Sequence, residues 1–151
     1  SGGNGLEVKK VFDTDFKAKS SAEELLLTGK DSEGEFSDVF PYPVDFELMQ
    51  LGQESYSIFC VTCHGAAGDG NGVTKPYGIL ATSYHDDRLR DATDGYIYDV
   101  ITNGKGLMYG LKDRLSNKER WAVVLYLRAL QRSQNASIES LSITEKSELG
   151  L

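Results

Sequence analysis

The stretch "SIFCVTCHGAAGDGNG", residues 57–72, decides how this chain is interpreted. It contains both cysteines of the chain, Cys60 and Cys63, and a histidine, His64, directly after the second cysteine. Four glycines in the last eight residues of the stretch predict a loop. The spacing Cys-x-x-Cys-His admits several chemistries, and the surrounding sequence has to distinguish among them.

Haem attachment is the interpretation that this motif favours. Cys-x-x-Cys-His is the attachment motif of c-type haem. Each thiol adds across one vinyl group of the porphyrin, and the two intervening residues space the sulfur atoms of Cys60 and Cys63 to match the two vinyl groups. His64 is then held under the iron as an axial ligand. The motif therefore predicts one covalently bound haem c.

Three other interpretations of the cysteines stay open. A thioredoxin-like dithiol lies at a helix N-terminus near a βαβ pattern, whereas here an amphipathic helix precedes the cysteines and a glycine loop follows them. A zinc site is arithmetically possible, because His85 brings the number of sulfur and imidazole ligands to four. The adjacent residues Cys63 and His64 would nevertheless fit a single tetrahedron poorly. A structural disulfide is the remaining interpretation.

A second axial ligand would make the haem an electron carrier instead of an open site. The chain has two methionines. Met49 belongs to the helix that leads into the motif, on the histidine side of the haem. Met108 lies in a glycine-bearing loop, residues 104–110, where the backbone can pass close to a flat cofactor. We therefore expect Met108 to be the distal ligand. His85 is its rival, and an ordinary buried core methionine is the alternative reading of Met108.

Helical patterns dominate the rest of the chain, and no strong strand pattern appears. We expect three main helices: one at 45–59 capped by Asp45, a short middle helix capped by Thr93 or Asp94 and ended in the left-handed manner by Asn103-Gly104, and a last helix with a capping box at 116–119 that ends near Arg132. The middle helix should bury Tyr96, Ile97, Val100 and Ile101.

Gly52 lies inside the first of these helices, where glycine costs about 1 kcal/mol relative to alanine. A second helix that crosses closely is the best explanation of such a glycine. A glycine that is merely tolerated is the alternative.

Charge and composition bound the class of protein. The chain has 151 residues and a net charge of −7, which argues against a nucleic-acid partner. No stretch approaches about 18 consecutive apolar residues, so we expect no membrane-spanning helix. No export signal is visible, and we expect that any such signal has been removed. The acidic excess lies in the two ends, which predicts an N-terminal tether or docking arm at 1–44, one domain at 45–133 and a polar C-terminal extension at 134–151.

Around the motif the chain resembles class I cytochromes c. That family has the spacing Gly-x3-aromatic-x3-Cys-x2-Cys-His, and the matching residues here are Gly52, Tyr56, Cys60, Cys63 and His64. The resemblance covers residues 45–133. It implies an all-α fold in which the N- and C-terminal helices cross around a covalently bound haem. It also implies that Val123 and Tyr126 of the last helix meet the glycine and the aromatic residue.

A narrower resemblance follows from the sequence of residues 51–72, 85–108 and 118–136. These stretches are similar to the monohaem cytochrome c subunit of alternative complex III, a bacterial quinol-oxidising membrane assembly. The resemblance implies an electron-transfer protein rather than an enzyme, which passes single electrons from that complex to a terminal oxidase. It matches Met108 to the distal methionine of the family, although Tyr109 follows here where a proline is common.

The same resemblance implies a periplasmic chain, often a lipoprotein held to the membrane by an N-terminal lipid. "SGGNG" at residues 1–5 is similar to the spacer after a lipidated cysteine, although a residual tag would look the same. A freely diffusing periplasmic cytochrome that serves another oxidase or reductase is the alternative. A haem-based ligand sensor is less favoured.

Two further groups are candidates for contacts around the haem. Arg88 and Arg90 are candidates to pair with the haem propionates, and Trp121 or Tyr84 to donate hydrogen bonds to them, with ordinary surface charge as the alternative. Residues 105–120 hold five basic and two acidic side chains. This basic stretch is expected either to rim the haem edge and steer an acidic partner, or to be a solvated surface.

Overall fold

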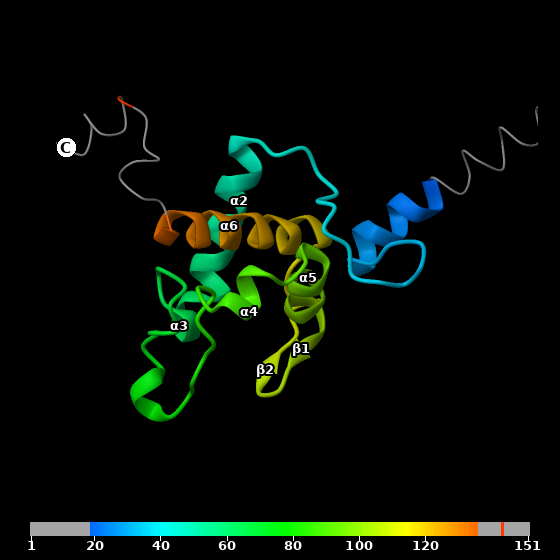
Figure 1. The fold of residues 1–151 in the computed structure, drawn as a ribbon. Coiled ribbons are helices and arrows are strands. Elements are labelled where there is room, and N and C mark those ends of the chain that lie inside the picture. The colour runs from blue at the N-terminus through cyan, green and yellow to red at the C-terminus, as the bar shows by residue number, and fades with distance from the viewer. Residues whose placement is uncertain (1–18, 136–142, 144–151) are drawn as a thin grey trace, which may run out of the picture.

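The computed structural model describes residues 19–135 and residue 143, and the statements below concern these residues. Helices dominate, with one two-stranded sheet, which confirms the expected all-α fold class (Figure 1). The elements in chain order are a helix at 19–28, α2 (Phe46–Phe59), α3 (Val61–His64), a 3-10 turn (Lys75–Tyr77), α4 (Asp87–Arg90), α5 (Asp94–Asn103), β1 (Gly104–Lys105), β2 (Met108–Tyr109) and α6 (Asn117–Asn135).

Helices α2 and α6 cross each other and form the frame of the domain (Figure 1). The Asp45 side chain caps α2, because it accepts a hydrogen bond of 2.8 Å from the backbone N–H of Leu48. Farther along α2, Gly52 faces α6 so closely that a Cβ atom there would overlap the backbone oxygen of Ala122. The predicted close helix crossing at Gly52 is confirmed.

Replacing Gly52 with alanine should therefore lower the free energy of unfolding by about 1–3 kcal/mol or more, the usual cost of overpacking a well-packed core. The obstructing atom belongs to the backbone of α6, so the helices have to separate to admit the methyl group. Denaturant unfolding measures the effect. Gln53→Ala on the exposed side of α2 is the control and should change stability by no more than about 0.5 kcal/mol. Equal stability of the two variants would contradict the crossing.

Aromatic contacts fill the core behind this crossing. Tyr56 of α2 contacts Tyr126 of α6 with ring centroids 5.2 Å apart, as the resemblance implied. Val123 is almost fully buried. Tyr98 of α5 stacks on Trp121 of α6 at 4.2 Å. Both rings of this stack are fully buried. The core therefore joins α5 to the crossing of α2 and α6.

The buried stripe of α5 differs from the expected one. Ile97 and Ile101 are buried as predicted, but Tyr96 and Val100 are only half-buried, and the stripe includes Tyr98. Tyr98 can be buried because its ring packs on an indole and its hydroxyl is hydrogen-bonded. The prediction of which α5 residues are buried was thus partly wrong.

The ends of α5 and α6 also test the predictions. Thr93 caps α5 through a hydrogen bond from the backbone N–H of Tyr96, and Ser116 and Glu119 form the predicted capping box of α6 with hydrogen bonds of 3.1 and 3.2 Å. The helix α6 continues to Asn135 instead of ending near Arg132. Residues 133–149 contain no glycine or proline that would stop it near Arg132.

The region around Met108 is a hairpin rather than the expected loop. Gly104 has a positive φ of 81°, but its ψ of 173° is extended, so the chain runs from α5 directly into β1 instead of closing the helix in the left-handed manner. The strand β1 pairs antiparallel with β2, and Lys105 lies opposite Met108. Gly106, with a φ of 58°, allows the tight turn between the strands.

The described part of the N-terminal segment, residues 19–44, packs along α5 and α6 (Figure 1). The backbone oxygen of Leu26 accepts a hydrogen bond of 2.9 Å from the indole N–H of Trp121, and the ring of Phe40 meets the edge of the same indole at 5.6 Å. The boundary at residue 44 stays a prediction. Residues 1–18, the "SGGNG" spacer among them, and all but three residues of the C-terminal extension lie outside the described residues.

Candidate functional site

The Cys-x-x-Cys-His motif forms the short helix α3, which directly continues α2. The backbone N–H of Cys60 still bonds to the oxygen of Tyr56, so the motif is held rigidly on the end of α2. Cys60 is buried and Cys63 half-buried, and neither forms a disulfide. Burial, with a smaller contribution from the nearby Cys63, raises the pKa of the Cys60 thiol to about 12. Both thiols are therefore free for other chemistry, and the disulfide interpretation gains no support.

The imidazole of His64 is oriented by the backbone of a distant loop. Its Nδ1 lies 3.3 Å from the backbone oxygen of Thr82. A proton on Nδ1 that is donated to this oxygen leaves the lone pair of Nε2 available to a metal. Burial lowers the pKa of His64, with a smaller opposite effect of the Thr82 carbonyl, so the ring is kept in the neutral form that a ligand requires.

Tyr84 contacts the motif directly, a role that the sequence did not reveal. Its ring lies almost parallel to the imidazole of His64, with centroids 4.6 Å apart and an interplanar angle of 18°. Burial is the largest cause that raises the pKa of the Tyr84 hydroxyl well above its ordinary value. The side chain was predicted to reach a propionate, whereas in this structure its ring covers one face of His64.

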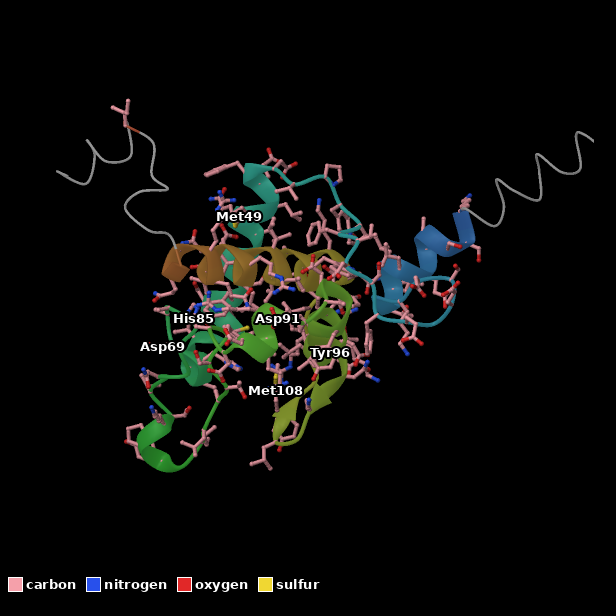
Figure 2. The ribbon with its side chains drawn as sticks, in the orientation of Figure 1. Met49, Asp69, His85, Asp91, Tyr96 and Met108 are labelled. Carbon is pink, nitrogen blue, oxygen red and sulfur yellow. The ribbon has the colours of Figure 1, made fainter. Side chains whose placement is uncertain are left out.

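The two methionines lie on opposite sides of α6. Figure 2 shows Met108 at the hairpin on the same side of α6 as α3, whereas Met49 lies on the part of α2 beyond α6. The side chain of Met108 is half-buried. This arrangement favours Met108 over Met49 as a partner of His64 across a cofactor.

The rival ligand His85 is engaged elsewhere. Its Nε2 lies 2.7 Å from the backbone oxygen of Ala67. Within residues 19–135, moreover, no three side chains from histidine, cysteine, aspartate and glutamate are grouped so that they could hold a metal ion. The arrangement therefore gives the zinc interpretation no support.

The residues around the motif fit a haem c. Two free thiols are spaced one helical turn apart, a neutral histidine follows with Nε2 available, and a methionine faces the same region. Large apolar side chains are also exposed on the loop after α3 and on the hairpin, and a flat apolar cofactor requires apolar surface of this kind. These side chains are Val73, Tyr77, Ile79, Leu80 and Leu107.

Comparison with known proteins identifies the family. Residues 47–127 match the model of a family described as cytochrome c oxidase, cbb3-type, subunit III. The chain belongs to this family. The protein is thus a c-type cytochrome with the class I fold, as the resemblance implied. It is an electron-transfer protein, and its family binds haem c covalently.

One solved structure supports the fold of the cytochrome. A reducing HAO-like protein complex of Kuenenia stuttgartiensis is similar at 19% identity with a TM-score of 0.52, over 71% of this chain and 54% of that one. Cytochrome cL of Methylophaga aminisulfidivorans is similar at 18% identity with a TM-score of 0.47, over 85% and 79% of the two chains. The cytochrome thus spans about half of the first protein, and at this identity the likeness concerns the fold alone. Among curated proteins, none matches.

Trp121, one of the predicted propionate contacts, lies fully buried in the core. Its indole N–H is already donated to Leu26, and its ring is fully buried against Tyr98. An indole has only one donor, so none is left for a carboxylate. The carbonyl group that accepts from this donor lies 95 residues away in the chain. This contact gives the propionate prediction for Trp121 no support, and it stays a prediction.

Arg88 and Arg90, the other predicted propionate contacts, differ in their surroundings. The Nε of Arg90 donates a hydrogen bond of 2.7 Å to the backbone oxygen of His85. Arg88 is exposed and approaches the hydroxyl group of Tyr96, to which Lys105 also donates a hydrogen bond of 2.5 Å. The hydrogen bond from Lys105 is the main cause that lowers the pKa of Tyr96, and Arg88 adds to it.

One of these two cations, Lys105, is opposite Met108 in the hairpin. Figure 2 shows Tyr96 on the side of the domain that carries Met108. Sequence reasoning missed Tyr96 and Lys105 as a group. Their positions on α5 and β1 become neighbours only through the hairpin, which the sequence did not predict. The carboxylate contacts of Arg88 and Arg90 stay predictions.

One of the five basic side chains in the stretch 105–120 does not lie at the surface. Arg120 is buried, and it donates hydrogen bonds of 3.0 Å to the backbone oxygen of Leu115 and to the hydroxyl group of Tyr98. It therefore joins α6 to α5 and cannot rim a docking surface. The exposed basic side chains of the stretch are Lys105, Lys112, Arg114 and Lys118.

Proposed function

We propose that this cytochrome carries single electrons on one haem c, attached through thioethers to Cys60 and Cys63, with the iron held between His64 and Met108. The observation that carries the assignment is the geometry of α3. Two free thiols lie one turn apart, and the histidine that follows has its Nδ1 directed to Thr82 and its Nε2 available.

When bound, the haem supplies an iron centre that gains or loses one electron. The residues of the chain determine how easily the iron gains or loses that electron. His64 and Met108 would hold the iron in both oxidation states, so its ligands would change little and the barrier to electron transfer would be low. Cys60 and Cys63 anchor the cofactor to a domain that would otherwise have a small core.

A reduced-minus-oxidised visible spectrum tests the proposal. We expect sharp low-spin bands of a c-type haem in the reduced protein and a weak charge-transfer band at the red edge of the visible in the oxidised protein. A colourless protein with no iron would sink the proposal. Carbon monoxide binding at neutral pH would favour a ligand sensor instead.

The donor is proposed to be a quinol-oxidising membrane assembly like alternative complex III, and the acceptor a terminal oxidase. The similarity of residues 51–72, 85–108 and 118–136 to its monohaem subunit supports this. The family description, which names an oxidase subunit, is consistent with a respiratory role. Co-purification with a quinol-oxidising complex is the expected result. Recovery of the cytochrome alone from gently solubilised membranes and periplasm would favour the freely diffusing carrier.

The place of work is proposed to be the periplasm, because haem is attached to c-type cytochromes outside the cytoplasm. Among the described residues, none of the helices is both long and apolar enough to cross a membrane. An N-terminal lipid is the proposed anchor, on the similarity of "SGGNG" to a lipoprotein spacer. Mass spectrometry of the native protein should find a lipidated cysteine before Ser1, and an unmodified N-terminus would contradict the anchor.

The exposed basic residues Lys105, Lys112, Arg114 and Lys118 should steer the cytochrome to an acidic partner. We expect the rate of oxidation by the terminal oxidase to fall about tenfold as salt rises, because electrostatic steering is screened. Arg114→Glu should slow the reaction at low salt, whereas Lys19→Glu on the distant N-terminal helix should not. Stopped-flow kinetics measures both, and a rate indifferent to salt and to Arg114→Glu would refute the steering.

A further inference from the structure

The segment 82–84 holds the imidazole of His64 in two ways. The carbonyl of Thr82 faces Nδ1 at 3.3 Å, and the ring of Tyr84 lies against one face of the imidazole at 4.6 Å. The hydrogen bond restrains the edge of the imidazole and the stack restrains its plane. Together they limit the rotation of the ring about an axis through Nε2.

Tyr84 is itself held in place by hydrogen bonds and packing contacts. Its backbone N–H donates to the oxygen of Gly68 at 2.8 Å, and its backbone oxygen accepts a hydrogen bond of 2.8 Å from the Nε2 of Gln131 on α6. A Cβ atom at position 68 would lie 2.6 Å from the Cδ2 of Tyr84, so the tyrosine ring packs directly against bare backbone. The edge of Tyr56 meets the same ring at 6.3 Å. The position of the Tyr84 ring is therefore fixed from several sides.

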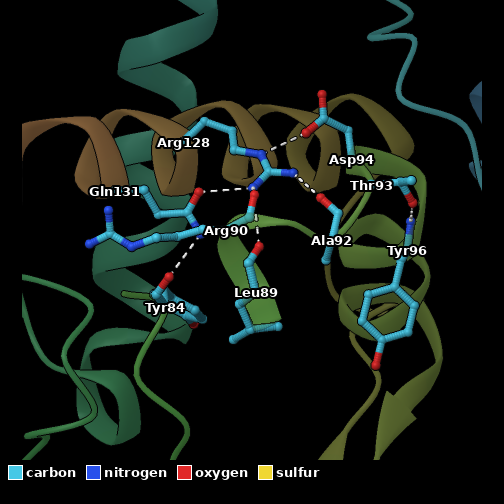
Figure 3. A network of polar contacts seen from close by, with 9 residues as sticks. All are labelled: Tyr84, Leu89, Arg90, Ala92, Thr93, Asp94, Tyr96, Arg128 and Gln131. Carbon is cyan, nitrogen blue, oxygen red and sulfur yellow. Dashed lines mark hydrogen bonds and ion pairs between the residues drawn. The ribbon is translucent and has the colours of Figure 1, made fainter. Parts of the chain in front are cut away.

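Gln131 is held in turn by Arg128, one helical turn earlier (Figure 3). The Nη1 of Arg128 donates to the Oε1 of Gln131 at 2.9 Å, which aims the amide nitrogen at Tyr84. Arg128 also pairs with Asp94 at 2.7 Å and donates to the backbone oxygens of Leu89, Arg90 and Ala92. The helix α6 thus holds residues 84–92 as one piece behind His64.

We propose that Tyr84 and Gln131 are positioning residues that fix the plane of the His64 ring and thereby set the reduction potential. The inference rests on the proposed function, because it requires His64 to be an axial ligand. Partners in the second shell orient a ligating histidine and raise its basicity, which stabilises the higher oxidation state of the metal. A looser Tyr84 weakens the hydrogen bond to Thr82, so the reduction potential should rise.

The experiment compares Tyr84→Leu, Tyr84→Phe and Gln131→Leu in the full haem-loaded chain. The readouts are the reduction potential and the hyperfine-shifted haem methyl resonances of the oxidised protein, because the latter report the plane of an axial imidazole. Tyr84→Leu and Gln131→Leu should redistribute the methyl resonances and favour reduction about threefold or more, which is about 30 mV for a one-electron couple. Tyr84→Phe keeps the stack and should retain the wild-type pattern.

The controls are Phe46→Leu, an exposed aromatic residue at the start of α2, and Gln134→Leu, an exposed glutamine of α6. Neither should change the resonances. If Tyr84→Leu fails to fold, Gln131→Leu still tests the proposal. It removes the hydrogen bond to the backbone oxygen of Tyr84 and leaves the Tyr84 and His64 side chains unchanged. Wild-type resonances and potential in both variants, with haem and the charge-transfer band retained, would overturn the inference. A wild-type protein without haem would instead overturn the proposed function on which it rests.

Discussion

Replacing Cys60 and Cys63 together with alanine should abolish covalent haem attachment. These are the only cysteines of the chain, so no other thiol can form a thioether. Each single variant should keep one bond and therefore some covalent haem, because His64 and the remaining thiol still position the cofactor. Haem staining after denaturing electrophoresis and the intact mass of the protein measure the result.

The double variant should also lose stability beyond the cost of two truncated side chains. A small domain buries little apolar surface by itself, and a covalently held cofactor adds to its core. The thermal midpoint should therefore fall by more than that of Ser57→Ala, an exposed neighbour of the motif that serves as control and should retain all of its haem. Covalent haem in the double variant would show that attachment lies elsewhere.

Replacing Met108 with alanine should open the second axial position while leaving the haem attached. The charge-transfer band should vanish, carbon monoxide should bind at neutral pH, and the reduction potential should fall. Methionine opposite histidine raises the potential, and axial ligands tune haem potentials over roughly 0.8 V, so we expect a fall of more than about 0.1 V.

Met49→Ala is the matched control, because Met49 is the only other methionine and lies beyond α6 (Figure 2). Its half-buried side chain contributes to packing, so this variant should lose some stability but keep the band and the potential. A band that survives in Met108→Ala would point to a different ligand. Loss of the band in Met49→Ala alone would reverse the assignment.

Local patterns predicted the frame of the fold well. Gly52 could be interpreted from the sequence because a glycine inside an amphipathic helix is costly unless another backbone approaches, and α6 does approach there. The caps at Asp45, Thr93 and Ser116 were also predictable, since each depends on residues only three positions apart.

Contacts between distant segments were not predictable from one sequence. The indole of Trp121 was assigned to a propionate because nothing marks Leu26 as its partner. Arg120 was counted as surface charge although it is buried against Tyr98, and an arginine on a helix carries no local sign of burial. The stack of Tyr84 on His64 likewise depends on a loop that returns 20 residues later. The motif residues of the site could thus be predicted from the sequence, whereas the side chains that pack around the motif could not.

The central claim, that Cys60 and Cys63 hold one haem c in an electron carrier, is tested most directly on protein isolated from its native cells. Intact mass spectrometry combined with the visible spectrum of the pyridine-treated, reduced protein counts the haem groups and reports the thioether bonds. The account predicts a mass increase of one haem that survives acid and organic solvent, together with the spectrum of a haem joined by two thioethers. A chain of unmodified mass, or a haem that is extracted by acidified solvent, would contradict it.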